Sequence, residues 1–142
     1  MSALHTFELE ILSPSKTFYR GACRSLTLPV GDGMMGVMAN HTPFSAAISD
    51  GEVRFTTPDG EAHICAVTRG IADMTDNRLW LLCESALAPD EIDAAAEQRA
   101  AEEAMREMRK KQSHRDFAIW QMTFQRAINN LKVKGRSSDV NL

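Results

Sequence analysis

Cysteine is scarce in this chain of 142 residues. Its three cysteines, Cys23, Cys65 and Cys83, are odd in number and contain no Cys-x-x-Cys pair. Such a set neither builds a disulfide framework nor supplies the paired ligands of a structural zinc site. We therefore expect three reduced, buried thiols and no metal centre.

Long apolar runs are also missing. No run approaches the roughly 20 residues that a membrane-spanning helix needs. The first residues, MSALHTFE, lack both the basic segment and the apolar segment of a signal peptide. We expect a chain that neither spans a membrane nor is secreted through a cleaved signal.

Catalytic motifs are absent as well. The four histidines, His5, His41, His63 and His114, are scattered, and the chain has no His-x-x-x-His pair and no Gly-x-Ser-x-Gly turn. His41, beside Thr42 and Pro43, is the one candidate general base, but a histidine in a turn is more often a hydrogen-bonded structural residue. We expect no catalytic residues and no enzymatic activity in the isolated chain.

Charge is distributed unevenly along the chain. Residues 1–105 hold seven Lys or Arg and sixteen Asp or Glu, whereas residues 106–136 hold nine Lys or Arg and two Asp or Glu. The basic segment predicts an acidic partner, although the acidic remainder of the same chain is an alternative. Nucleic acid is disfavoured because the acidic majority repels phosphate and no aromatic platform accompanies the basic residues.

Residues 7–83 follow the pattern of a β protein. Phe7, Leu9 and Ile11 alternate with polar residues, as in a strand with one buried face. Short strands separated by turn signals, without a helical pattern between them, predict an antiparallel sandwich or a flattened barrel. Further strands are expected from 18 to Gly21, over 22–30, from 42, around 53–55, over 61–67, in a segment broken by Gly70, and as a buried closing strand over 79–83. Turns are expected at 13–16, 31–33, 49–51 (a hairpin turn), 58–60 (a hairpin turn) and 76–77.

A methionine-rich stretch follows the third predicted strand. Met34, Met35 and Met38 lie beside the turn residues 31–33 and Gly36. Methionine is flexible and packs with little specificity, so this stretch suits an adaptable contact surface better than a core strand. Burial of these side chains in the core is the alternative.

The periodicity becomes helical after Ala88. Pro89, Asp90 and Glu91 predict a helix start, and this helix is expected to end near Lys111. Ser113 predicts the N-cap of a second helix, which is expected to stop at Gly135. The short connection makes the two helices antiparallel. The predicted first stripe is Ile92, Ala96, Ala100, Ala104 and Met108, and the second face is Phe117, Trp120, Phe124, Ile128 and Leu131.

These stripes differ in bulk. An alanine seam buries little apolar area and stabilises the hairpin weakly. The aromatic face cannot be covered by alanines alone, so we expect it to pack also on the β domain or on a partner. A weakly attached hairpin with a basic tip is therefore a candidate moving part.

Several short motifs, in order, resemble the epsilon subunit of the rotary F-type ATP synthase. They are LTLP at 26–29, GDG at 31–33, GV at 36–37, HTPF at 41–44, RGIA at 69–72, KKQSH at 110–114 and AINNLKV at 127–133. The resemblance covers nearly the whole chain. It implies a β-sandwich of about ten strands over residues 1–87, followed by a two-helix hairpin over residues 88–142.

The resemblance implies a non-catalytic central-stalk subunit of a proton- or sodium-translocating complex. In that family the sandwich connects the gamma subunit to the c-ring, and the hairpin can extend along gamma and restrain ATP hydrolysis through contacts with gamma and the beta subunits. The expected partners are therefore gamma, the c-ring and the beta and alpha subunits. The expected location is peripheral, on the cytoplasmic face of the bacterial plasma membrane, through the complex alone. Residues matching the gamma and c-ring contact are Gly33, Met34, Met35, Gly36 and His41, to which we add Met38; candidates for inhibitory contacts are Arg109, Lys110, Lys111, Arg115, Arg126 and Lys132.

Two departures from the family pattern affect ligands. Met34 stands where a carboxylate is frequent, and Ala39-Asn40 where Pro-Gly is frequent, which makes the expected ring contact more apolar. Some bacterial members bind ATP through a motif that here begins with Ile92 and Asp93, but Ala96 and Glu97 replace its Arg-Ala pair. The missing guanidinium weakens the case for ATP, with Arg99 as a substitute, and we expect no cofactor. A free-standing adaptor whose basic hairpin binds an acidic protein or a nucleotide is the alternative function.

Overall fold

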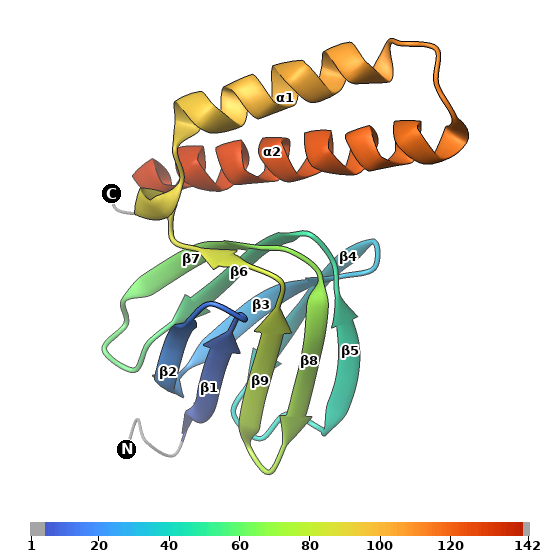
Figure 1. The fold of residues 1–142 in the computed structure, drawn as a ribbon. Helices are drawn as coiled ribbons and strands as arrows, with labels where there is room; N and C mark the ends of the chain where they lie inside the picture. Colours follow the sequence, from blue (N-terminus) through green and yellow to red (C-terminus); the bar gives the residue numbers. More distant parts are fainter. Residues whose placement is uncertain (1–4, 141–142) are drawn as a thin grey trace. The chain divides into compact units, whose positions relative to one another are not determined.

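The computed structural model describes residues 5–140, with side chains to residue 136, as two compact units, Met1–Ala88 and Pro89–Leu142. The first unit is built from strands and the second from helices (Figure 1). The strands are β1 (Phe7–Leu12), β2 (Thr17–Cys23), β3 (Ser25–Val30), β4 (Gly33–Met38), β5 (Phe44–Ile48), β6 (Gly51–Thr56), β7 (Ala62–Val67), β8 (Gly70–Thr75), β9 (Arg78–Cys83) and β10 (Ala86–Leu87). The helices are the 3-10 helix η2 (Pro89–Glu91), α1 (Ala94–Met108) and α2 (His114–Val140).

The ten strands form two five-stranded sheets. Sheet A has the order β2-β1-β9-β8-β5, and sheet B has the order β10-β7-β6-β3-β4. Neighbouring strands are antiparallel except β1 and β9, which run parallel. The predicted β-sandwich with a C-terminal helical hairpin is confirmed, and the flattened barrel is not.

The core lies between the inner faces of the two sheets. Phe7, Leu9 and Ile11 of β1 are almost completely buried, as their alternation predicts. Leu79 and Leu81 of β9 meet the same core. Full burial of one such side chain stabilises the fold by about 1.5–3 kcal/mol, so the sandwich has an apolar core of its own.

Of the two predicted hairpin turns, 58–60 is confirmed and 49–51 is wrong, and the predicted turn at 76–77 also forms a hairpin. Asp76 and Asn77, which join β8 to β9, both have positive φ, as a two-residue hairpin turn requires. Residues 58–60 join β6 to β7, with Gly60 at φ +87°. Residues 49 and 50 instead carry the chain from β5 in sheet A to β6 in sheet B, because turn residues do not specify whether the flanking strands pair.

Two strand boundaries also differ from the prediction. The break falls at Arg24 rather than at Gly21, because the chain leaves sheet A after Cys23 and enters sheet B at Ser25. Gly70 does not break a strand but begins β8, where it pairs with Cys83. A Cβ atom at Gly70 would lie 1.9 Å from Leu82 O, so the backbone of β9 requires glycine there.

The first helix starts later and the second ends later than predicted. Pro89 to Glu91 form only the 3-10 turn, and α1 begins after Asp93, whose carboxylate accepts a hydrogen bond from Ala96 N at 3.1 Å. Ser113 caps α2 as predicted, since its Oγ accepts from Asp116 N at 3.1 Å. Gly135 lies inside α2, which continues to Val140.

The hairpin packs through small side chains. The predicted stripe of the first helix is on its buried side: Ile92 and Ala104 are buried, and Ala96, Ala100 and Met108 are half-buried. Ala101 and Ala104 of α1 are buried, and Ala127 and Val133 are the buried residues of α2. The predicted face of α2 is confirmed in part: Trp120, Phe124, Ile128 and Leu131 are half-buried, whereas Phe117 is exposed. The seam forms from the smallest residues because these allow the two helices to approach most closely.

The three thiols are buried as predicted. Burial raises the pKa of both Cys23 and Cys83 to about 11, from an ordinary value of 9.0. The folded chain therefore keeps protons that the unfolded chain releases above pH 9, so we expect the free energy of unfolding to fall between about pH 9 and pH 11. Urea titrations across this range measure the effect, and the double variant Cys23→Ala/Cys83→Ala, compared with its own value at pH 8, should lose less stability.

Candidate interaction surfaces

Strand β4 carries the methionine-rich stretch at the edge of sheet B. Met34 and Met38 are 54% and 64% exposed, and Gly36 lies between them on the same face with open space above it. Met35 faces inward and packs against the core. The stretch is therefore an edge strand rather than a loop, and its outer face presents two flexible apolar side chains.

His41 lies in the crossing that follows β4. Its backbone N donates to Met38 O at 3.2 Å, and its Nδ1 lies 2.7 Å from Thr42 O. Its ring meets Phe44 edge to face, with centroids 5.1 Å apart. These contacts give His41 a structural role at the end of β4, close to Met38.

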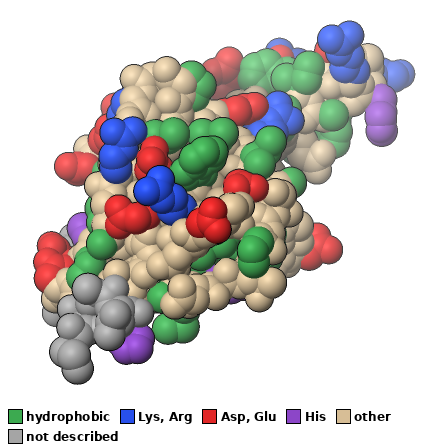
Figure 2. Space-filling model, turned by 90° about the horizontal axis from the view of Figure 1, so that it is seen from below, with side chains coloured by type: hydrophobic (Ala, Val, Ile, Leu, Met, Phe, Trp, Pro, Cys, Tyr) green, Lys and Arg blue, Asp and Glu red, His purple; other side chains and the backbone are tan. Residues whose placement is uncertain are grey.

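The basic residues of the hairpin fall into two groups. Arg109, Lys110, Lys111 and Arg115 gather where α1 ends and α2 begins, and Lys110 Nζ pairs with Glu107 Oε2 at 2.5 Å. Figure 2 shows Lys and Arg side chains gathered beside a histidine. Arg126 and Lys132 follow Arg115 along α2 by about 16 Å and about 25 Å, so the structure does not bring all six together.

The structure does not support a nucleotide site at the three candidate nucleotide-binding residues. Ile92 is 3% exposed, in the core of the helical unit, and the carboxylate of Asp93 caps α1. Arg99 is exposed, and six residues of helix place it about 240° around the axis from Asp93. The structure does not bring these three side chains together around one ligand position.

The outer face of sheet A carries an apolar surface that the sequence analysis missed. Ile71, Trp80 and Leu82 are 59%, 48% and 48% exposed. The strand registers place Leu12, Leu82, Ile71 and Ala47 side by side across β1, β9, β8 and β5. We call these four residues the apolar row. A hollow of about 520 Å³ adjoins it, lined in part by Pro14 and Gly70.

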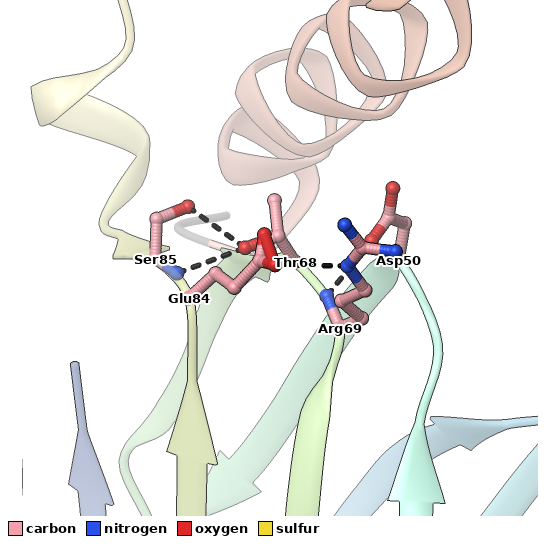
Figure 3. A network of polar contacts seen from close by, with 5 residues as sticks. All are labelled: Asp50, Thr68, Arg69, Glu84 and Ser85. Atoms are coloured by element: carbon pink, nitrogen blue, oxygen red, sulfur yellow. Dashed lines mark hydrogen bonds and ion pairs between the residues drawn. The ribbon is translucent and has the colours of Figure 1, made fainter. Parts of the chain in front are cut away.

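A polar network lies at the end of sheet A. Figure 3 shows Arg69, whose backbone N donates to Asp50 Oδ1 at 2.8 Å and whose Nε donates to Glu84 Oε1 at 2.8 Å. The carboxylate of Glu84 raises the pKa of Arg69. Beside it, Ser85 N donates to Thr68 Oγ1 at 2.8 Å. The network ties together three places where the chain crosses from one sheet to the other, after β5, after β7 and after β9.

The comparisons with known proteins cover both units. The family model "ATP synthase, Delta/Epsilon chain, beta-sandwich domain" matches residues 6–89, which is more than half of the chain. This chain belongs to the ATP synthase delta/epsilon family. An ATP synthase epsilon chain of Syntrophomonas wolfei is 31% identical over 127 residues, which are 89% of this chain and 93% of that protein.

A further relative is also an epsilon chain, and two solved structures share the fold. A sodium ion specific ATP synthase epsilon chain of Propionigenium modestum is 29% identical over 128 residues, which are 90% of this chain and 93% of that one. A chain of the Euglena gracilis mitochondrial ATP synthase shares the fold with a TM-score of 0.70 at 16% identity, over 96% of this chain and 82% of that one. A chain of the Tetrahymena thermophila mitochondrial ATP synthase central stalk and c-ring shares the fold with a TM-score of 0.66 at 11% identity. The match covers 89% of this chain and 95% of that one.

The described part of this epsilon-family chain shows two further properties. Among residues 5–140, no helix is long and apolar enough to cross a membrane. No cluster of three or more His, Cys, Asp or Glu side chains that could hold a metal ion occurs in the same part.

Proposed function

We propose that this chain is the non-catalytic central-stalk subunit that couples rotation of the c-ring to the gamma subunit and the catalytic head. Membership of the epsilon family supports this assignment, and a protein with the same fold lies in the Tetrahymena thermophila central stalk and c-ring. In this proposal the chain lies at the cytoplasmic face of the bacterial plasma membrane and is held there by the complex alone.

The apolar row and Trp80, which lies on the same outer face of sheet A, carry the proposal. A water-soluble sandwich with its own core gains nothing from exposing Ile71, Trp80 and Leu82 together on one sheet. Exposed tryptophan and aliphatic side chains on a flat surface are typical of the centre of a protein interface. We assign this face to the gamma subunit, and the outer face of β4, with Met34, Gly36 and Met38, to the ring, with Gly33 at the start of the strand beside it.

The hairpin has the second role in this proposal. Its basic tip, formed by Arg109, Lys110, Lys111 and Arg115, matches an acidic surface on the beta subunits, and its small seam holds the two helices weakly. A hairpin of this kind can leave one contact for another at low cost. We propose that it restrains ATP hydrolysis when its tip meets the catalytic head.

The substitution Leu82→Asp tests the docking face. A carboxylate in the centre of an apolar interface is desolvated without a partner, so the affinity for the purified gamma subunit is expected to fall by about a hundredfold. Isothermal titration of the full chain measures it. The control is Ala62→Asp, at the exposed first residue of β7 in sheet B. This variant should bind gamma as the parent does. Equal binding by the Leu82→Asp variant would refute this docking face.

A further inference from the structure

One carboxylate on the outer face of sheet A is held in place by two neighbours. Asp73 Oδ1 accepts a hydrogen bond from Ser45 Oγ at 2.7 Å, and its Oδ2 accepts from Thr75 Oγ1 at 3.2 Å. Both donors are neutral, and a carboxylate has about four acceptor positions. Within the described residues no Lys or Arg forms an ion pair with Asp73. The carboxylate is therefore oriented, and its charge is left uncompensated.

An aromatic ring stands next to this carboxylate. Asp73 and Trp80 are directly paired across β8 and β9, and both line one hollow of about 530 Å³. Trp80 is half exposed, so its indole can meet a partner. A carboxylate beside an indole is a favourable place for a guanidinium or ammonium group, which gains an ion pair and a cation–π contact.

The surrounding charge favours a cation as well. Two adjoining hollows on this face are lined by the carboxylates Glu8, Glu10, Asp73 and Asp76 and by the guanidiniums Arg20 and Arg78. Arg20 Nη2 pairs with Glu10 Oε2 at 3.4 Å. The remaining groups are three acids and one base, so the local field attracts positive charge although Arg78 is present. Red and blue side chains lie among green ones on the face that Figure 2 presents.

We propose that Asp73 and Trp80 form a receptor for one Arg or Lys side chain of the gamma subunit, next to the apolar row that takes its apolar side chains. This inference rests on the proposed function and adds the chemistry of the partner to it. The segment of gamma that docks here carries a basic residue adjacent to apolar ones. Ser45 and Thr75 are positioning residues, because they act through the carboxylate that they orient.

The test compares two Asp→Asn variants of the full chain in titrations with the purified gamma subunit. Asp73→Asn removes the positioned charge and should weaken binding by about tenfold at low salt. The binding of the Asp73→Asn variant should also depend less on salt, because one ion pair is gone. Asp76→Asn removes a charge from the same hollow, at an exposed turn position with φ +52° that asparagine tolerates. Because Asp76 contributes only to the local field and not to the proposed ion pair, Asp76→Asn should weaken binding by less than about twofold.

A second readout follows Trp80 directly. In a Trp120→Phe background Trp80 is the remaining tryptophan of the chain, and its emission should shift to shorter wavelength when gamma covers it. With Asp73→Asn the shift should persist but require about tenfold more gamma.

The possible results distinguish failure of the Asp73–Trp80 receptor from failure of the docking face as a whole. Parent-like affinity of the Asp73→Asn variant, or weaker binding with an unchanged salt dependence, would overturn the cation receptor. If Leu82→Asp abolishes binding in the same series, the docking face itself stands. If Leu82→Asp binds normally, the proposed function of this face fails and the receptor fails with it.

Discussion

The substitution Gly70→Ala is expected to destabilise the sandwich severely. The added Cβ would lie 1.9 Å from Leu82 O and 2.8 Å from Cys83 Cα. Both are backbone atoms of β9, the central strand of sheet A, so relief requires separating β8 from β9. We expect a loss of about 3–5 kcal/mol in the free energy of unfolding, which is a large part of the stability of a small domain. Urea denaturation followed by circular dichroism measures it.

Gly36→Ala is the matched control for this prediction. Gly36 also lies in a strand, but a Cβ there meets nothing within 4 Å. Its substitution should change the free energy of unfolding by no more than about 0.5 kcal/mol. A Gly70→Ala protein as stable as the control would show that the close approach of β8 and β9 is not a requirement of the fold.

The substitution Ala104→Glu should open the helical hairpin and leave the sandwich intact. Ala104 is 0% exposed in the seam between α1 and α2, where a carboxylate finds neither room nor water. We expect α1 and α2 to lose about 3 kcal/mol of protection against hydrogen exchange, while β1 and β9 keep theirs, because the two units are separately compact. In the assembled enzyme the same variant should raise ATP hydrolysis, if the intact hairpin is what restrains it.

Ala118→Glu is the control for Ala104→Glu, because it adds the same charge to the hairpin outside the contact between α1 and α2. Ala118 is exposed in the first turns of α2, where an acid is tolerated or favoured by the helix dipole. This variant should keep full protection of both helices. Hydrolysis that rises equally in both variants would detach the inhibitory role from the packing of the hairpin.

The strands of the sandwich could be predicted well from the sequence because one face of most strands is solvated, which makes polar and apolar residues alternate. In β1 Phe7, Leu9 and Ile11 alternate with Glu8 and Glu10, and the strand appears as expected, although Leu12 at its end breaks the alternation. In β9 four large apolar residues follow one another from Leu79 to Leu82, so the pattern does not reveal which pair is outside. The exposed pair, Trp80 and Leu82, belongs to the proposed docking face, so the face was missed where periodicity carried no information.

Helix ends and sheet crossings were predicted less well, for a related reason. Pro89 and Gly135 are local signals, but a glycine inside a helix costs only about 1 kcal/mol, and packing in the hairpin outweighs it. The turn at Ser49 and Asp50 has hairpin composition, yet the strands on either side belong to different sheets. The positions of Asp73, Ser45 and Thr75 relative to one another depend on strand register, which the sequence alone does not supply.

The parallel pairing of β1 with β9 has a consequence for biosynthesis. Leu9 lies beside Leu79, so the first strand to leave the ribosome waits for about seventy more residues before its central neighbour exists. Until then the nascent chain can form the local β1–β2 hairpin and parts of sheet B, but sheet A stays open with an unpaired, apolar-flanked edge. We therefore expect the sandwich to assemble late and slowly, after β9 has been synthesised. Before that point the nascent chain depends most on a chaperone.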